Sequence, residues 1–173
     1  NLNKEKMAQI DKSKPVLVTG ATGYVAGWLV KKLLDEGMTV HAAVRNPDNE
    51  KKVAHLNKAV SEAKGSIKYF KSDLLKEGSY AEAMAGCELV YHTASPFITN
   101  VQDPQRDLVD PAVKGTQNVL ETASKTPSVK RVVVTSSCAA IYGDAIDIKS
   151  APNGILTEDV WNTSSSLSYQ PYS

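Results

Sequence analysis

The sequence lacks any apolar run close to the roughly 20 residues that a membrane-spanning helix needs. It also lacks an excess of charge of one sign, since its formal net charge is +1. A balanced charge gives no general attraction to nucleic acid or to a membrane surface. The first residues are polar and charged, so we expect no signal peptide among them. We therefore expect a cytoplasmic globular protein without a nucleic-acid or membrane partner.

Cysteine is scarce, because only Cys87 and Cys138 are present. Two thiols without a disulfide framework are typical of a reducing compartment, although one disulfide stays open. Metal-ligand spacings are absent as well. The three histidines, His41, His55 and His92, lie far apart in the sequence, so we expect structural or surface histidines and no metal.

The two ends of the sequence differ from the rest in composition. Residues 1–14 are polar and lack an apolar face, so we expect a flexible arm there and one domain over residues 15–173. The last ten residues, SSSLSYQPYS, stop within a polar segment without a closing element. We expect further chain beyond Ser173.

Short apolar runs alternate with longer helical stretches between residues 15 and 137. Strands are predicted at residues 15–20, 38–45, 66–74, 87–95 and 129–137, and helices at 24–37, 47–65, 79–86 and 103–125. Pro111 is expected either to bend the last helix or to mark its start. The alternation predicts a parallel α/β sheet with flanking helices. From Cys138 onward the sequence predicts irregular structure.

Three of the predicted elements indicate which residues face the core. The first strand is continuously apolar, as expected for a strand that is covered on both faces. The predicted inward residues of the first helix are Val25, Trp28, Leu29 and Leu33, and those of the second are Val53, Leu56 and Val60.

The segment VTGATGYVAGWLV, residues 18–30, joins the first strand to the first helix. Such a turn either packs tightly or binds phosphate, because glycine permits positive φ and a helix N-terminus attracts an anion. The strand before it and the amphipathic helix after it favour a dinucleotide-binding turn. Gly27 lies inside the helix, where glycine costs about 1 kcal/mol relative to alanine. That cost predicts close packing of the helix at Gly27.

Charged residues follow the second and third strands. Arg45 stands where an acidic residue would favour NAD, and Lys51 and Lys52 follow it. This arrangement favours the 2′-phosphate of NADP, the alternative being a solvated basic surface. Asp73 ends the third strand, where its carboxylate either accepts a hydrogen bond from adenine or caps the following helix.

Seven stretches in order resemble the extended short-chain dehydrogenase/reductases, in particular the branch of dihydroflavonol 4-reductase and cinnamoyl-CoA reductase. They are VTGATGYVAGWLV, AAVRNPDNEKK, KSDL, VYHTASP, VKGTQNVLE, RVVVTSS and QPYS. The resemblance runs from Pro15 to Ser173 and implies a Rossmann-type doubly wound sheet that binds NADP. Ala26 departs from the third glycine of the family's TGxxGxxG turn, a position that tolerates alanine.

The resemblance also implies which residues contact the cofactor. The pyrophosphate is assigned to Gly20, Thr22, Gly23, Tyr24 and Val25, the 2′-phosphate to Arg45 and Lys52, the adenine side to Asp73 and Leu74, and the ribose and nicotinamide side to Thr93, Ala94 and Ser95.

Catalysis in this family uses a serine, a tyrosine and a lysine four residues after the tyrosine. The lysine is needed because free tyrosine has a pKa near 10, and a nearby cation lowers it. Ser137 matches the serine, with Ser136 as its rival and a strand-end cap as the structural alternative. Tyr172 matches the tyrosine, because Tyr169 would need its lysine where Ser173 stands. The lysine for Tyr172 would follow Ser173.

The resemblance implies an NADPH-dependent reductase that transfers hydride to the carbonyl of a small aldehyde or ketone. Nucleotide-sugar epimerases or dehydratases and hydroxysteroid dehydrogenases are alternatives on the same scaffold. A non-catalytic NADP-sensing protein and an isolated cofactor-binding half are alternatives from another class. Because most of the family's substrate domain follows Tyr172, we expect the truncated chain to lack parts that catalysis needs.

Overall fold

The computed structural model describes residues 8–96 and 100–171 of the chain. It consists of two compact units, one formed by Asn1–Ser95 and Val113–Val134 and the other by Pro96–Ala112 and Thr135–Ser173. Within the described residues, no helix is both long and apolar enough to cross a membrane. The predicted division into an arm at 1–14 and a domain at 15–173 stays a prediction.

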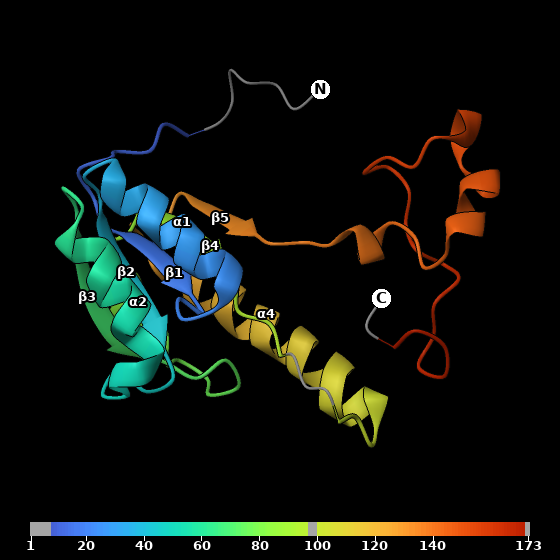
Figure 1. The fold of residues 1–173 in the computed structure, drawn as a ribbon, viewed down its shortest axis with the longest axis horizontal. Helices are drawn as coiled ribbons and strands as arrows, with labels where there is room; N and C mark the ends of the chain where they lie inside the picture. The colour runs from blue at the N-terminus through green and yellow to red at the C-terminus, as the bar shows by residue number, and fades with distance from the viewer. Residues whose placement is uncertain (1–7, 97–99, 172–173) are drawn as a thin grey trace. The chain divides into compact units, whose positions relative to one another are not determined.

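A five-stranded parallel sheet forms the centre of the first unit (Figure 1). Its strands are β1 (Val16–Thr19), β2 (Thr39–Val44), β3 (Ser66–Lys71), β4 (Leu89–His92) and β5 (Arg131–Val134). Their order is β3-β2-β1-β4-β5, and each neighbouring pair is parallel. This is the order of the Rossmann fold, and its direction of winding reverses between β1 and β4. The predicted fold class and all five strands are therefore confirmed.

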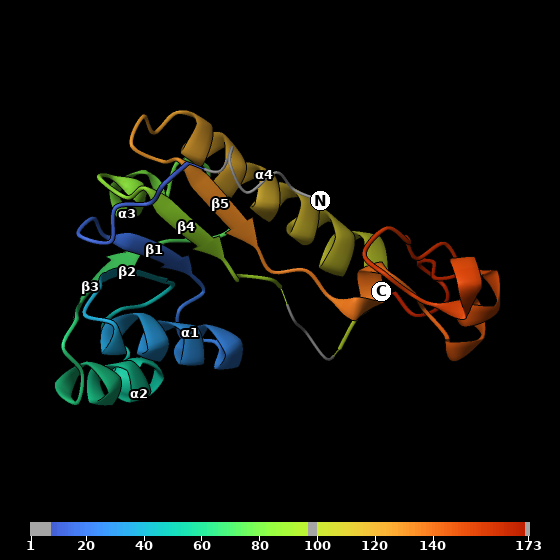
Figure 2. The same ribbon diagram turned by 90° about the horizontal axis from the view of Figure 1, so that it is seen from above.

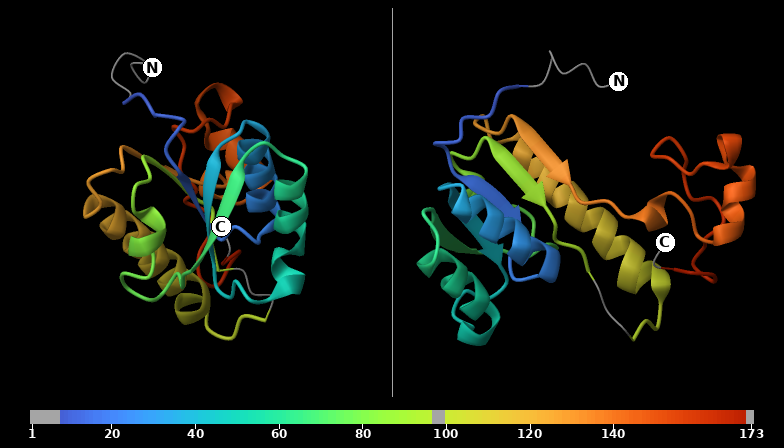
Figure 3. Two further views of the ribbon diagram at one scale, coloured as in Figure 1. Left: turned by 90° about the vertical axis from the view of Figure 1, so that its left-hand side faces the viewer. Right: turned by 45° about the horizontal axis from the view of Figure 1, so that its top comes forward.

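Helices cover both faces of this sheet (Figure 2 and Figure 3). On one face, α1 (Tyr24–Asp35) and α2 (Glu50–Ser61) pack against Val16 and Val18 of β1. On the other face, α3 (Ala81–Met84) and the C-terminal part of α4 (Asp110–Ser124) pack against Leu17. All four residues of β1 are buried, which confirms that this strand is covered on both faces.

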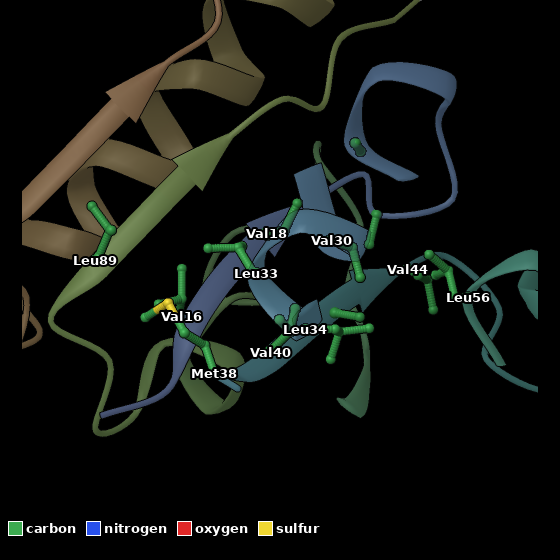
Figure 4. Close-up of a cluster of buried hydrophobic side chains, with 13 residues drawn as sticks. Val16, Val18, Val30, Leu33, Leu34, Met38, Val40, Val44, Leu56 and Leu89 are labelled. Carbon is green, nitrogen blue, oxygen red and sulfur yellow. The ribbon is translucent and has the colours of Figure 1, made fainter. Parts of the chain in front are cut away.

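The core beneath α1 and α2 is made of aliphatic side chains (Figure 4). Val30 and Leu34 of α1, Leu56 of α2 and Val40 of β2 are each 0% exposed. Full burial of one such side chain contributes about 1.5–3 kcal/mol to folding. Ile10, in the segment before β1, also packs against this cluster, a contact that the polar composition of residues 1–14 does not indicate.

The buried face of α1 differs from the predicted one. Val25 and Trp28 are each 62% exposed, whereas the buried residues are Ala26, Val30, Leu33 and Leu34. The prediction was wrong for Val25 and Trp28 because α1 has apolar residues on most sides, so periodicity alone does not select one face. The small Ala26 faces inward where α1 starts close to the sheet. In α2 the prediction is confirmed, since Val53 and Leu56 are buried and Val60 packs against the core.

The segment around Pro111 consists of two kinds of helix. A π-helical turn, η2 (Gln105–Val109), precedes α4, and Pro111 lies in the first turn of α4. The chain is already helical before Pro111, because η2 continues into α4 and Asp110 between them has helical φ and ψ of −56° and −48°. Proline has no N–H to donate to the preceding turn, and the regular α-helical pattern is interrupted by the π-helical turn just before it. Pro111 therefore marks the start of the α-helical part, and it is not the first helical residue of the segment.

After β5 the chain contains three short 3₁₀ segments, η3 (Cys138–Ala140), η4 (Ala145–Ser150) and η5 (Pro152–Gly154). The residues between and after them have no regular helix or strand among those described, apart from an isolated bridge between Ser166 and Tyr169. The predicted irregular structure is confirmed.

Candidate functional site

The turn between β1 and α1 needs glycine at two positions for different reasons. Gly20 has a φ of +63°, and a Cβ atom there would lie 2.9 Å from Ala94 Cα. Gly23 has a φ of −72° and donates its N–H to Gly20 O over 2.9 Å. A Cβ atom on Gly23 would lie 3.2 Å from that same oxygen. The positive φ that the motif predicts is thus present at Gly20, while close approach of the backbone explains Gly23.

The N-terminus of α1 is open to an anion. Gly23 occupies the N-cap position without a side-chain cap, and the first turn contains no acidic residue. The partial positive charge at the end of this 12-residue helix is therefore not neutralised by a carboxylate of its own first turn. Thr22 is partly exposed, and Gly23, Tyr24 and Val25 are exposed. Apart from the Gly23 N–H, which is bonded to Gly20 O, the backbone N–H groups here are available to a pyrophosphate.

The departure at Ala26 leaves the exposed side of the turn unchanged, because the methyl group of Ala26 lies in the core. At Gly27, a Cβ atom would lie 3.3 Å from two ring atoms of His55 on α2. The close packing that the sequence predicts at Gly27 is confirmed, and its partner is His55.

The two cations predicted to hold the 2′-phosphate, Arg45 and Lys52, lie near the end of β2 and the start of α2. Arg45 directly follows β2, Lys52 lies in the first turn of α2, and both are exposed. Within residues 8–96 and 100–171, neither forms an ion pair with a carboxylate. The Ala21 N–H donates to Ala43 O over 3.2 Å, which connects the glycine turn to β2 two residues before Arg45. Both charges are thus available to a phosphate as well as to solvent.

The loop after β3 holds Asp73 and Leu74. The Asp73 carboxylate accepts the Leu75 N–H over 2.9 Å and so closes a turn. It does not cap the following helix, the structural role that the sequence left open, because the N-cap of α3 is Tyr80. Asp73 is nevertheless exposed. Leu74 packs against Gly115, where a Cβ atom would come within 2.4 Å of Leu74 Cγ.

Asn118 of α4 is 8% exposed, and its sequence does not single it out as a functional residue. Its side-chain amide donates to Leu74 O over 3.0 Å and to Lys76 O over 2.9 Å, and its Oδ1 accepts the Gly78 N–H over 3.2 Å. Asn118 thereby holds the loop that bears the predicted adenine-side pair. It lies in the stretch VKGTQNVLE, yet nothing in that stretch indicates a partner some 40 residues earlier.

The segment Thr93–Ser95 contacts the glycine turn. Thr19 Oγ1 accepts the N–H groups of Thr93 and Ala94, each over 3.1 Å. Thr93 Oγ1 donates to Thr19 O. The structure therefore brings together two of the predicted cofactor-contacting groups, the glycine turn and the end of β4.

Ser136 and Ser137 lie in the second unit and are both exposed. The Ser137 hydroxyl accepts the Ala139 N–H over 3.1 Å and caps η3, which is the structural alternative for this serine. Both serines also line a cavity of about 340 Å³, together with Cys138, Ala140, Ile141, Glu158, Val160 and Trp161. Ser137 thus stands beside a space that a small molecule can enter.

Of the two candidate tyrosines, only Tyr169 lies among the described residues. Tyr172 lies outside the described residues. The Tyr169 hydroxyl donates to Asp144 Oδ2 over 2.5 Å. This hydrogen bond to a carboxylate raises the pKa of Tyr169. A proton donor near neutral pH needs the opposite shift, so the environment of Tyr169 argues against it as the catalytic acid.

The histidines have the structural or surface positions that the sequence predicts. His92 is buried, His41 is partly buried with its Nδ1 2.8 Å from Ala83 O, and His55 is exposed. Among the described residues, no group of three or more His, Cys, Asp or Glu side chains is placed to hold a metal ion.

Comparison with known proteins gives consistent matches. A model of the NAD dependent epimerase/dehydratase family matches residues 16–166. The chain is 49% identical over 148 residues to a cinnamoyl-CoA reductase of Medicago truncatula. The matched region covers 86% of this chain and 44% of the relative. It is 41% identical over 130 residues to a dihydroflavonol 4-reductase of Solanum lycopersicum, covering 75% of this chain and 34% of the relative.

Among solved structures, Gre2 of Candida albicans in complex with NADPH matches with a TM-score of 0.70 and 34% identity. That match covers 87% of this chain and 44% of the Gre2 chain. The chain thus spans less than half the length of the relatives that it matches.

Proposed function

The chain belongs to the NAD dependent epimerase/dehydratase family, and from this we propose that the whole protein is an NADPH-dependent reductase of aldehydes or ketones. The proposal draws on the reductases among its relatives and on Gre2, whose structure was solved with NADPH. A cytoplasmic location is part of the proposal, since Cys87 and Cys138 are both free thiols.

The observation that favours NADP is that Arg45 and Lys52 form no ion pair among the described residues, and that Arg45 follows the strand to which the glycine turn is hydrogen-bonded. The N-terminus of α1 offers N–H groups to a pyrophosphate, and β2 ends at Arg45 instead of a carboxylate. Arg45 and Lys52 would hold the 2′-phosphate, because a guanidinium and an ammonium both form charge-assisted hydrogen bonds with phosphate oxygens. The residues present therefore fit NADP better than NAD.

The chemistry that NADPH would supply when bound is hydride transfer to the carbonyl carbon. Thr93, Ala94 and Ser95 would support the ribose and nicotinamide side of the cofactor, as the resemblance implies. Ser137 would donate a hydrogen bond to the carbonyl oxygen, and Tyr172 would give that oxygen a proton as it gains negative charge. A lysine four residues after Tyr172 would lower the tyrosine pKa. Ile141, Val160 and Trp161 beside Ser137 favour an apolar carbonyl compound.

The cofactor part of the proposal is tested by titrating the full-length protein with NADPH and NADH and following nicotinamide fluorescence. We expect Arg45→Ala and Lys52→Ala each to weaken NADPH binding by about 10- to 100-fold, since a hydrogen bond between charged groups contributes about 1.5–3 kcal/mol. Binding of NADH should change little. Lys51→Ala is the matched control, because Lys51 is the exposed cation next to Lys52. Equal losses for NADPH and NADH would contradict the assignment.

The catalytic part is tested with NADPH and a panel of apolar aldehydes and ketones. Tyr172→Phe should lower kcat by about 100-fold or more while leaving the Kd for NADPH unchanged, because general acid catalysis contributes about 10²–10⁴-fold. Tyr169→Phe is the control and should leave kcat within about threefold. If NADPH binds but no carbonyl compound is reduced, the NADP-sensing alternative is favoured. Tightly retained NAD⁺ in the purified protein would instead favour an epimerase or dehydratase.

A further inference from the structure

The last residues of β1 and β4 meet in a buried polar contact. Thr19 and His92 are register partners in the parallel pairing of these strands, and they are 0% and 3% exposed. Thr19 Oγ1 lies 2.8 Å from His92 Nδ1. Gly20 follows Thr19, and Thr93 follows His92, so the contact joins the starts of two predicted cofactor-contacting segments.

The hydrogen bonds around Thr19 determine the direction of this contact. A threonine hydroxyl has one hydrogen and two lone pairs. Thr19 Oγ1 already accepts the N–H groups of Thr93 and Ala94. Its one hydrogen is therefore left for His92 Nδ1, which must act as an acceptor.

This direction fixes the tautomer of His92. A neutral imidazole that accepts at Nδ1 carries its proton at Nε2. His92 Nε2 lies 3.5 Å from Thr116 Oγ1 of α4, and that hydroxyl is free to accept. Burial lowers the pKa of His92 and so favours the neutral ring. Thr19 from β1 and Thr116 from α4, both uncharged, are the described hydrogen-bonding partners of this imidazole.

The contact also determines where the backbone after β4 lies. Ala94 lies close against the glycine turn, because a Cβ atom added to Gly20 would lie only 2.9 Å from Ala94 Cα. Thr93 Oγ1 donates back to Thr19 O, which closes the arrangement. The turn and the segment Thr93–Ser95 therefore hold one another in place.

We propose that His92 is a positioning residue for the cofactor-binding surface. As an acceptor at Nδ1, it orients the Thr19 hydroxyl so that both lone pairs receive the N–H groups of Thr93 and Ala94. This fixes the turn at Gly20 relative to the segment that is proposed to support the ribose and nicotinamide. The inference rests on the proposed binding of NADPH. The hydrogen bonds among Thr19, His92, Thr93 and Ala94 are nevertheless formed without any cofactor.

The experiment pairs removal of each group with its conservative replacement. Thr19→Val removes the hydroxyl and keeps the shape, whereas Thr19→Ser keeps the hydroxyl. His92→Leu removes the acceptor, whereas His92→Asn offers an amide oxygen close to the position of Nδ1. We expect Thr19→Val and His92→Leu to weaken NADPH binding by about tenfold, and Thr19→Ser and His92→Asn to stay within about threefold of the unchanged protein.

Two further measurements use the cofactor-free protein. Nitrogen-15 NMR of the unchanged full-length protein should show His92 neutral with its proton on Nε2. Amide hydrogen exchange at Thr93 and Ala94 should be faster in Thr19→Val and His92→Leu than in the two conservative variants. Unfolding curves identify any variant that fails to fold. The tautomer of His92 is measured in the protein without substitutions, so it does not depend on whether the variants fold.

The outcomes separate the two proposals. A proton on Nδ1 of His92 in the unchanged protein would overturn the positioning role. So would Thr19→Val and His92→Leu proteins that fold and bind NADPH with unchanged affinity. If the unchanged protein does not bind NADPH, the proposed function fails, while the tautomer and the exchange rates still decide the role of His92.

Discussion

Gly20 is a single residue with two separate structural constraints. Its φ of +63° lies in the left-handed region, and any Cβ atom would meet Ala94. Gly78 has only the first constraint, because its φ is +71° and nothing lies within 4 Å of a Cβ atom there. The two glycines therefore allow the strain of the backbone to be separated from the steric contact.

We expect Gly78→Ala to lower the free energy of unfolding by about 1 kcal/mol through its φ alone. Gly20→Ala should cost about 3 kcal/mol, since overpacking adds about 1–3 kcal/mol to the same strain. Urea unfolding of the two variants gives the comparison. Equal losses would mean that the turn moves away from Ala94 without cost, and that the close approach at Gly20 is unimportant for stability.

At the scale of elements, the packing of α1 on α2 depends on Gly27 and His55. A Cβ atom at Gly27 would lie 3.3 Å from the ring of His55, which is tighter than ordinary contact but involves an exposed side chain. Glycine inside a helix costs about 1 kcal/mol relative to alanine. Gly27→Ala thus combines a gain in helix stability with the displacement of one ring.

A double-mutant cycle separates these two effects. In the background of His55→Ala, Gly27→Ala should raise the free energy of unfolding by about 1 kcal/mol. In the unchanged background the gain should be smaller by about 0.5 kcal/mol or more, because the ring must move. Denaturant unfolding of the four proteins measures the coupling. The same gain in both backgrounds would show that His55 does not restrict the approach of α1.

Elements far apart in the sequence also meet at Asn118. Its three hydrogen bonds join α4 to the loop after β3, and Leu74 of that loop packs on Gly115. A buried amide without partners costs about 1–3 kcal/mol, so these contacts make one conformation of the loop strongly preferred. The exposed Asp73 is held in place by a residue of another element.

At the scale of the whole first unit, Glu88 connects the N-terminal segment to two strands. Its Oε2 accepts the Asp11 N–H over 2.9 Å, and its Oε1 pairs with Lys130 Nζ over 2.8 Å. Its own backbone oxygen accepts the N–H groups of Lys130 and Arg131 at the start of β5. The hydrogen bond from Asp11 and the pairing with Lys130 lower the pKa of Glu88 below its usual 4.5.

This shift predicts how stability depends on pH. A carboxyl group whose pKa is lower in the folded state stabilises the fold above its unfolded pKa, and the contribution is lost as the pH falls through the folded value. Glu88→Gln should therefore be less stable than the unchanged protein at pH 7, and the difference should shrink as the pH falls below 4.5. Thermal unfolding between pH 7 and pH 3 measures it. Glu77→Gln, an exposed loop position, is the control. A difference independent of pH would point to packing instead of charge.

The features that depend on neighbours along the chain could be predicted before the structure was known. The alternation of strands and helices, the burial of β1, the glycine turn and the start of α4 near Pro111 all followed from local periodicity and backbone chemistry. Arg45 at the end of β2 could likewise be located from the sequence, because a strand end is a local feature. The assignments of Ser137 and Tyr172 depend on family resemblance and stay predictions.

The features that join distant residues became visible in the folded chain. The inward face of α1, the loop contacts of Asn118 and the contact between Thr19 and His92 were not predicted from the sequence. Thr19 and His92 are 73 residues apart and meet because β1 and β4 pair in one register. The sequence around a histidine or threonine is the same whether its side chain bonds to water or to a buried hydroxyl group. The partner is selected by the packing of the sheet, and packing is a property of the whole fold.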